Sequence, residues 1–445
     1  MAADRFVVLG LAGVRATWFA DVARWATAAT IPVDFVKVVS REEARARLLS
    51  GRAFSALLVD AGMGALDRDL VDLATTHACA VIAADDGRTA IAFDALGVRD
   101  VLPVGFGPDA LVDALTAVAL PVTRGDDLLV PARAGATADA AAGEWRGRLV
   151  AVTGAGGVGR STVAAALATG LAADPRDRGL VLLADLALHA HQALLHDAGD
   201  VVPGVLELVE AHRAGGLPPH EVRSLCFRVA DRGYDLLLGL RRHRDWTALR
   251  PRAVAAALDA TVRAYRHVVA DVDADVEGER QCGSTDVEDR NLLARQALPA
   301  ADLVLVVGVP GIVGLHAQLR VVADLVEHGV DAGRVLPVVN RAPRSPAARA
   351  EVGRALTQLL AAAVPGAVLA GSPVFVAERR RLNEVARDAS APPAPVVKPV
   401  TGAVRGLLDR ARHAAPPPGP PSRGEEPVLV APGSLGSWAD LGPDA

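Results

Sequence analysis

The sequence predicts an α/β protein with two doubly wound parallel-sheet domains and a Pro-rich C-terminal tail. Short runs rich in β-branched residues alternate with helical patterns over residues 1–120, and the same alternation returns over residues 148–412. Strands separated by helices indicate parallel sheets that are covered on both faces. Residues 121–147 are mostly small, polar or helix-breaking, which predicts a linker. The proline content of residues 413–445 predicts a disordered tail.

The composition excludes several classes of protein. The 445 residues fit two or three domains, and 51% of them are hydrophobic, so the chain can bury a large core. A formal net charge of -5 is not that of a protein that coats nucleic acid, and we expect no sequence-specific nucleic-acid partner. Cys79, Cys226 and Cys282 are far apart and form no Cys-x-x-Cys pair, which suits a reducing cytosol.

Neither the N-terminus nor any apolar stretch has the pattern of a membrane-targeting segment. The N-terminus contains an acidic residue and enters a strand pattern at once, unlike a signal peptide. The longest apolar stretch starts at Leu303, is interrupted by glycine and proline, and is too short to span a bilayer. We therefore expect a cytoplasmic protein whose only membrane association is peripheral, at the inner face of the plasma membrane at a pole or septum.

Strand patterns occur in both blocks. In the first block the expected strands are residues 6–11, 34–40, 56–62, 79–85 and 98–104, with helical patterns such as 41–50 and 70–77 between them. In the second block they are residues 148–154, 179–185, 234–240, 267–273, 303–309, 335–340 and 367–374.

The second block opens with a glycine-rich loop, TGAGGVGRST at residues 153–162, between a predicted strand and a predicted helix. It fits the pattern Gly-x-x-x-x-Gly-Lys-Ser/Thr, except that arginine replaces the lysine. Glycines let backbone N–H groups close around phosphate oxygens, and the N-terminus of the following helix attracts the anion. The candidate phosphate-binding residues are Gly154, Gly156, Gly157, Val158, Gly159, Arg160, Ser161 and Thr162. The alternative is a strand-to-helix turn without a ligand.

Two residues of the loop carry the expected chemistry. The hydroxyl of Ser161 stands where such loops complete a Mg²⁺ shell. Arg160 keeps a positive charge, but its planar fork is bulkier than an ammonium group and does not replace it at a tight site. We expect nucleotide binding to survive and ATP hydrolysis to be weak or lost, because hydrolysis depends on close placement of charge.

The loop resembles that of the MinD/ParA family of deviant Walker ATPases. In that family a signature lysine follows the first loop glycine, and this chain has Ala155 there. Both family lysines are therefore replaced, at Ala155 and Arg160. The resemblance covers about residues 148–410. It implies binding of ATP or ADP with Mg²⁺ and a homodimer.

The resemblance also assigns the metal side of the site. Asp185 matches the first aspartate at the end of the family's switch I strand, whereas the second one, near the attacking water, is Ala187 here. Asp271 falls on the metal-side aspartate of the Walker B strand, with Val272 and Asp273 after it. Ser161, Asp185 and Asp271 would then form the Mg²⁺ side. Asp185 and Asp271 also fit a purely structural role as strand-end caps.

Two later segments extend the same resemblance. Asn340 ends a strand whose terminal asparagine contacts adenine in the family, and Arg341 follows it. The segment around Pro310 matches a strand, a proline-containing loop and a helix. The resemblance thus implies that Asn340 and Arg341 contact the base.

The first block, residues 1–120, resembles a response-regulator receiver that lacks its chemistry. Asp60 ends the third strand, where receivers accept a phosphoryl group. No acid follows the first strand, Ala83 and Ala84 stand where a hydroxyl belongs, and Val104 replaces the lysine. We therefore expect an atypical receiver that binds proteins, with phosphorylation of Asp60 as the alternative.

A receiver-like domain ahead of a MinD-like domain resembles the CpaE/TadZ group of localisation factors. This implies a spatial regulator that binds ATP or ADP and positions a partner complex, in septum-site determination or in Flp/Tad pilus and secretion assembly. Two alternatives are a slow ATPase that cycles on a membrane or DNA, and a scaffold that binds no nucleotide.

Four further segments have a functional and a structural interpretation. The histidines of residues 189–196 lack the spacing of a zinc site, so we expect them to lie at the surface. The basic run at residues 378–387 predicts a solvated helix face, or else nonspecific DNA contact. Residues 400–415 form an amphipathic helix that packs on the domain or binds a membrane surface. Apolar residues within 434–442 suit a docking peptide or an unstructured end.

Overall fold

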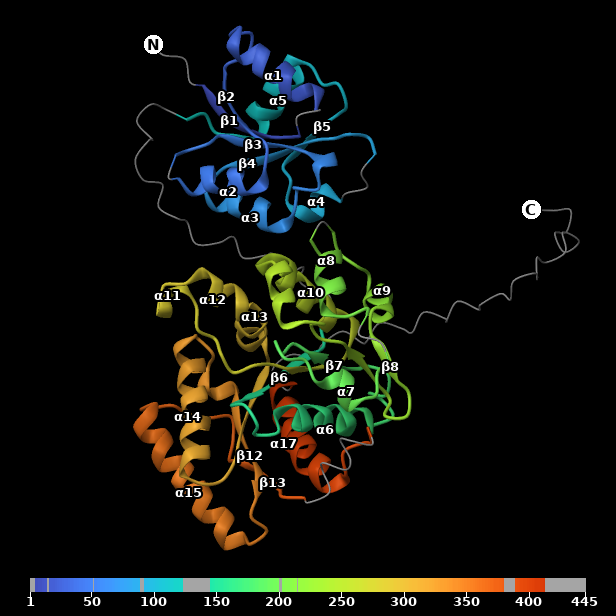
Figure 1. Cartoon of the computed structure of the whole chain (residues 1–445), viewed down its shortest axis with the longest axis vertical. Coiled ribbons are helices and arrows are strands. Elements are labelled where there is room, and N and C mark those ends of the chain that lie inside the picture. Colours follow the sequence, from blue (N-terminus) through green and yellow to red (C-terminus); the bar gives the residue numbers. More distant parts are fainter. Residues whose placement is uncertain are drawn as a thin grey trace, which may run out of the picture.

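Two parallel sheets form the cores of the two halves of the chain (Figure 1). The computed structural model describes residues 5–13, 16–50, 52–88, 92–122, 145–199, 202–213, 215–379 and 389–412. We call the part before residue 123 the first unit and the part from residue 145 the second unit. The predicted α/β fold class with two doubly wound sheets is confirmed. The expected tail at 413–445 and most of the expected linker at 121–147 lie outside the described residues.

The first unit is a five-stranded parallel sheet in the order β2-β1-β3-β4-β5. Its strands are β1 (Phe6–Leu11), β2 (Val33–Val38), β3 (Ala56–Asp60), β4 (Ala80–Ala84) and β5 (Asp100–Leu102). Its helices are α1 (Thr17–Thr27), α2 (Arg41–Leu49), α3 (Arg68–Thr76), α4 (Phe93–Leu96) and α5 (Pro108–Val118). The strand order is that of flavodoxin-like doubly wound folds. β5 is shorter than expected because Pro103 has no N–H to continue the ladder.

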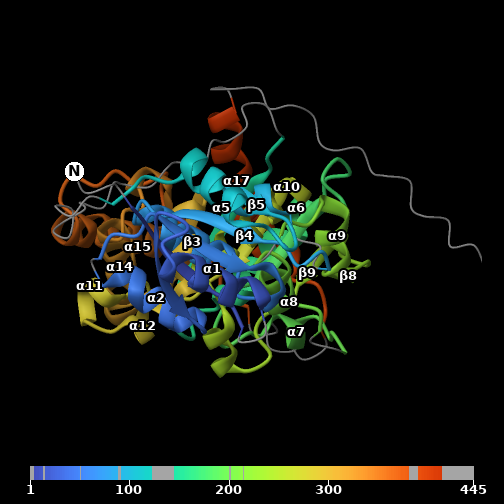
Figure 2. The ribbon, with the colours of Figure 1, turned by 90° about the horizontal axis from the view of Figure 1, so that it is seen from above.

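Helices cover both faces of this sheet. The core on one face contains Val22 of α1 and Leu111 of α5, and the core on the other contains Leu48 of α2 and Leu70 of α3. Viewed from above, α1 and α5 lie in front of the strands (Figure 2). The strands are buried on both faces, which explains why they read as continuous apolar runs.

The second unit is an eight-stranded sheet in the order β13-β12-β11-β6-β10-β7-β9-β8. Its strands are β6 (Arg148–Gly154), β7 (Val181–Asp185), β8 (Phe227–Val229), β9 (Tyr234–Leu237), β10 (His267–Asp271), β11 (Leu303–Gly308), β12 (Val335–Ala342) and β13 (Val374–Ala377). Only β8, at the edge, runs antiparallel among the described strands. The strand expected at 367–374 is displaced to β13, because Gly371 and Pro373 break the ladder before it.

Helices also cover both faces of the second sheet. Those of the second unit are α6 (Arg160–Ala172), α7 (Gln192–Leu195), α8 (Val205–Ala211), α9 (Pro219–Ser224), α10 (Pro251–Ala264), α11 (Glu279–Cys282), α12 (Thr285–Arg290), α13 (Leu292–Ala300), α14 (Ile312–Glu327), α15 (Pro346–Ala363) and α17 (Ala394–Arg412). Helices α6 and α17 pack on one face, and α8, α10, α13 and α14 pack on the other. The central strand β6 leads directly into α6, which places the glycine loop at the carboxyl edge of the sheet.

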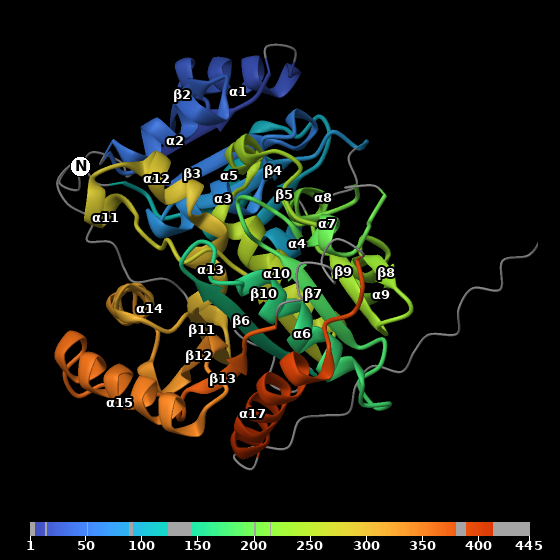
Figure 3. The same cartoon turned by 60° about the horizontal axis from the view of Figure 1, so that its bottom comes forward.

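The amphipathic C-terminal helix packs on the second unit. Val396, Val400, Val404 and Leu408 of α17 are buried in the same core as α6 (Figure 3). A Cβ atom at Gly170 of α6 would lie only 1.9 Å from Thr401 Oγ1, so the glycine lets the two helices approach closely. The apolar stripe expected at 400–415 is therefore covered by protein as far as the described residues show.

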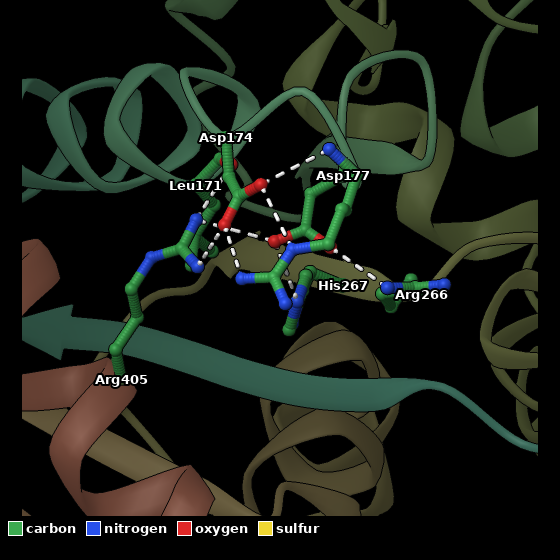
Figure 4. Close-up of polar contacts among 7 residues, drawn as sticks. Leu171, Asp174, Asp177, Arg266, His267 and Arg405 are labelled. Carbon is green, nitrogen blue, oxygen red and sulfur yellow. Dashed lines mark hydrogen bonds and ion pairs between the residues drawn. The ribbon is translucent and has the colours of Figure 1, made fainter.

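Polar contacts at the end of α6 hold α17 in place (Figure 4). Arg405 of α17 donates hydrogen bonds to the Leu171 carbonyl at 2.9 Å and to Asp174 and Asp177 at 3.2 Å each. Asp177 also accepts a bond from Arg266 at 3.2 Å. These cations and the nearby His267 hold the pKa of the Asp177 carboxyl below its usual range, although burial alone would raise it.

The two units contact each other through α3 (Figure 1). Arg68, the first residue of α3, donates from Nε to the His212 carbonyl and from Nη2 to the Gly215 carbonyl, both at 3.1 Å. Its backbone N–H donates to the Arg213 carbonyl at 3.1 Å. One arginine of the first unit thus satisfies several backbone acceptors of the segment that follows α8.

A second set of interunit contacts joins α3 to α10. The backbone N–H of Arg252 donates to the Asp69 carboxylate at 3.1 Å. The Arg252 guanidinium pairs with Asp72 at 2.6 Å.

Within the part of the chain that the structure describes, no helix is long and apolar enough to cross a membrane.

Candidate phosphate-binding site

The glycine loop lies between the end of β6 at Gly154 and the start of α6 at Arg160. Gly159 has a φ of +89°, and a Cβ atom there would lie 2.4 Å from Asn340 Nδ2, so this position requires glycine. A Cβ atom at Gly156 or Gly157 would meet no atom within 4 Å. The loop therefore turns a bare backbone toward open space at the N-terminus of a helix, where N–H groups lack intrahelical partners.

The last residues of β12 hold the loop from behind. Asn340 Nδ2 donates to the Val158 carbonyl at 2.8 Å, and Arg341 Nη2 donates to the Gly157 carbonyl at 3.0 Å. Arg341 has a φ of +52° and donates its N–H to Asn340 Oδ1 at 2.9 Å. Asn340 is only 6% exposed and does not line the pocket in front of the loop. A contact of Asn340 or Arg341 with adenine thus stays a prediction.

A pocket of about 780 Å³ opens in front of the loop. This volume lies in the usual range of small-molecule sites. The predicted residues that line it are Gly154, Gly156, Gly157, Gly159, Arg160, Ser161 and Thr162. The residues that sequence reasoning did not place there are Ala155, Leu188, His189, His191, His243, Asp273, Ala274, Asp275, Arg290 and Asn291. Most of the loop is therefore assembled around one cavity.

Arg160 points toward the carboxyl end of β10. Its Nε donates to Asp271 Oδ1 at 2.6 Å and its Nη1 donates to Asp273 Oδ1 at 2.7 Å. The side chain of Arg160 is 14% exposed and that of Asp271 only 1%. Burial alone would lower the pKa of Arg160, but attraction to the two carboxylates raises it above its usual value. The guanidinium is thus a buried cation held by two acids.

Asp185 and Asp271 lie side by side at the ends of β7 and β10, where they are register partners and fully buried. Burial and the neighbouring charge of Asp271 raise the pKa of Asp185 well above its usual range. Gln192 joins the two acids, because its N–H donates to Asp185 at 2.8 Å and its Nε2 donates to Asp271 at 2.8 Å. Gln192 Nε2 also donates to the Ser161 carbonyl at 3.0 Å.

These contacts bear on the expected Mg²⁺ site. Magnesium takes oxygen ligands in near-octahedral geometry. Both carboxylate oxygens of Asp185 accept hydrogen bonds, from Ala187 N and Gln192 N. Both oxygens of Asp271 accept from Arg160 and Gln192. Ser161 lines the pocket, but the acids behind it offer no carboxylate oxygen free of a protein donor, so the donor set does not fit Mg²⁺ as it stands.

Histidines gather at the opposite wall of the pocket. The rings of His189 and His243 lie 4.7 Å apart between centroids, and His191 lines the same pocket. Over the described residues no group of three or more His, Cys, Asp or Glu side chains is arranged to hold a metal ion. Arg290 lines this wall as well and donates to Asp275 at 2.8 Å.

Sequence reasoning missed two residues that organise the site. Asp273 lies two positions after Asp271, and alternate residues of an extended chain face the same side. This spacing could have placed Asp273 beside Asp271 in the site. Gln192 carries no such signal, because it reaches the site only through the fold of the segment after β7. The basic run at 378–387 and the apolar segment at 434–442 lie almost wholly or wholly outside the described residues.

Comparison with known proteins gives structural neighbours only. No family model matches the chain, and no curated protein matches it in sequence. A ParA family ATPase from Chlorobium tepidum is similar over 58% of this chain and 98% of its own, with 16% identity and a TM-score of 0.45. The septum site-determining protein MinD of Pyrococcus horikoshii, solved with Mg-ADP, is similar over 60% and 99%, with 17% identity and a TM-score of 0.43. A McdA–ATP complex from Cyanothece is similar over 60% and 98%, with 17% identity and a TM-score of 0.42.

Proposed function

We propose that the second unit binds ATP or ADP in the glycine loop, and that the chain is a spatial regulator of the MinD/ParA type. The observation that carries the proposal is the bare loop backbone at Gly156 and Gly157, set at the start of α6 in front of a pocket of about 780 Å³. Backbone N–H groups in this position bind phosphate oxygens. Arg160 and Ser161 line the same pocket and add a cation and a hydroxyl.

The proposed role is binding with weak or absent hydrolysis. Position 187, where the resemblance places an aspartate near the attacking water, is an alanine that is 1% exposed. Arg160 is bound to two acids, so the placement of its charge is set by them and not by a phosphate alone. Hydrolysis of a phosphoanhydride depends on positioned charge and an oriented water. The bound nucleotide would therefore act as a conformational signal.

The first unit is proposed as a receiver-like module for protein contacts. Asp60 accepts a hydrogen bond from Gly62 N at 2.9 Å, which caps the turn after β3. This contact gives Asp60 a structural role that needs no phosphorylation. By its resemblance to the CpaE/TadZ layout, the chain would act as a homodimer that places a septum or pilus/secretion complex.

The proposal is tested by titrating the full chain with fluorescently labelled ATP. Gly156→Val is the informative variant, because a Cβ atom there meets no atom within 4 Å and the position belongs to the loop that would hold the phosphates. Gly402→Val in α17 is the matched control, since its Cβ also meets no atom within 4 Å. We expect saturable binding that is lost in Gly156→Val and kept in Gly402→Val. Absence of binding to the unaltered chain would contradict the proposal and leave a nucleotide-free scaffold.

A further inference from the structure

We infer that the Arg160 guanidinium takes the place of a divalent cation between Asp271 and Asp273, at the end of β10, and the bound phosphates, so that the site binds nucleotide without Mg²⁺. This inference rests on the proposed nucleotide binding. It concerns which cation the site uses, not whether the loop binds phosphate.

The first support is that every carboxylate oxygen of these acids already accepts a hydrogen bond from the protein. The two oxygens of Asp273 accept hydrogen bonds from Arg160 Nη1 at 2.7 Å and from Leu188 N at 2.7 Å. The oxygens of Asp185 and Asp271 are bonded to protein donors in the same way. A Mg²⁺ ion would have to share each carboxylate oxygen with one of these donors or displace it, and it also surrenders its own water ligands reluctantly.

The second support is the position of the guanidinium. Arg160 bonds Asp271 and Asp273 and also lines the pocket. A guanidinium has five N–H donors in a fixed fork, and the bonds to Asp271 and Asp273 use one each from Nε and Nη1. Arginine forms planar, bidentate contacts with phosphate as readily as with carboxylate. One side chain can thus join the buried acids to an anion in the pocket.

The third support is the cost of removing Arg160 from this position. Asp271 is buried and its partner cation is Arg160. Breaking a buried pair by withdrawing one partner is strongly destabilising, because it leaves an unpaired charge. A lysine would not reproduce this arrangement, because its three-donor ammonium lacks the planar fork that bonds both acids and still has donors left for a phosphate. The arginine is therefore the residue that makes the site independent of metal.

The experiment compares nucleotide affinity with and without Mg²⁺. The full chain is titrated with fluorescently labelled ADP in excess EDTA and again in excess MgCl₂. We expect the two dissociation constants to agree within about threefold, because Arg160 stays paired with Asp271 and Asp273 in both buffers. For Arg160→Lys, which loses the fork that bonds both acids, we expect a dependence on Mg²⁺ of about tenfold or more.

Arg148→Lys is the matched control. Arg148 lies at the opposite end of β6 from the loop and pairs with Asp302 at 2.8 Å. This variant should keep the metal-independent affinity. Binding of the unaltered chain that is lost in EDTA would overturn the inference while leaving the proposed function intact. Absence of binding in both buffers would overturn the inference together with the proposed function. The comparison on the unaltered chain decides even if Arg160→Lys does not fold.

Discussion

Arg160, the first residue of α6, and Asp271, the last residue of β10, form an ion pair of 2.6 Å between side chains that are 14% and 1% exposed. Arg160 also lines the glycine-loop pocket. A second acid, Asp273, lies 2.7 Å from the same guanidinium. The stability of the second unit should therefore depend on these acids unequally.

We predict that Asp271→Ala lowers the free energy of unfolding by about 3 kcal/mol, because it leaves a buried cation with one remaining partner. Asp273 is 30% exposed, so Asp273→Ala should cost only about 1 kcal/mol. Urea denaturation followed by circular dichroism measures both. Equal losses for the two variants would show that burial of the pair does not control its strength.

We predict that acid weakens the fold through His196. Burial lowers the pKa of His196 to about 4, and the ring bonds Gln192 O and Tyr234 Oη at 2.7 Å each. Because the unfolded chain binds this proton near pH 6.5 and the folded chain does not, stability falls as the pH drops from 6.5 to 4. The loss is about 3 kcal/mol for this group.

The effect of His196 is measured as the difference in free energy of unfolding between two proteins. The free energies of unfolding of the unaltered chain and of His196→Gln are compared at several pH values. The advantage of the unaltered chain should shrink on acidification, since the variant has no imidazole to protonate. A difference that stays constant between pH 7 and pH 4 would contradict the assignment.

We predict that the close contact between α6 and α17 cannot accept a methyl group. A Cβ at Gly170 would lie 1.9 Å from Thr401 Oγ1 and 2.7 Å from Val397 Cγ1. Gly170→Ala should therefore destabilise the chain by about 1–3 kcal/mol, as overpacking does. Gly402→Ala in α17 meets open space and should instead stabilise by about 0.5–1 kcal/mol. A melting temperature that falls in Gly170→Ala and rises in Gly402→Ala would support the close packing of the two helices. An unchanged melting temperature in Gly170→Ala would contradict it.

We predict that Arg68 holds the two units together. Arg68→Ala removes the side-chain bonds to the His212 and Gly215 carbonyls. Hydrogen exchange should then rise in α3 and in the segment after α8, and stay unchanged in β11. Arg24→Ala is the control, because its side chain is 70% exposed and pairs with Asp21 of the same helix. Exchange that is unaltered in Arg68→Ala would show that other contacts suffice.

The parts of the fold that follow local rules could be predicted from the sequence. The strand β6, the glycine loop and α6 combine a buried apolar run, a glycine cluster and a helix start, so their order and boundaries agree with the prediction. The edge strands were harder. β8 is three residues long and antiparallel, and β13 begins only after Pro373, so neither has a distinct pattern.

The site was predictable only in part for a related reason. Gly156 and Ser161 belong to one continuous motif, whereas Arg160 meets Asp271 and Asp273 across more than one hundred residues of chain. Gln192 reaches its partners through the path of a segment without regular structure before α7. Such contacts depend on tertiary packing, which no local pattern encodes.

The central claim is that the chain binds nucleotide in the glycine loop without turning it over. The most direct measurement is a titration with ATP by calorimetry, followed by a phosphate-release assay on the same sample. The account predicts saturable binding near one nucleotide per chain and phosphate release no faster than in the Gly156→Val variant. Steady phosphate release by the unaltered chain that is absent in Gly156→Val would contradict it and identify a working ATPase.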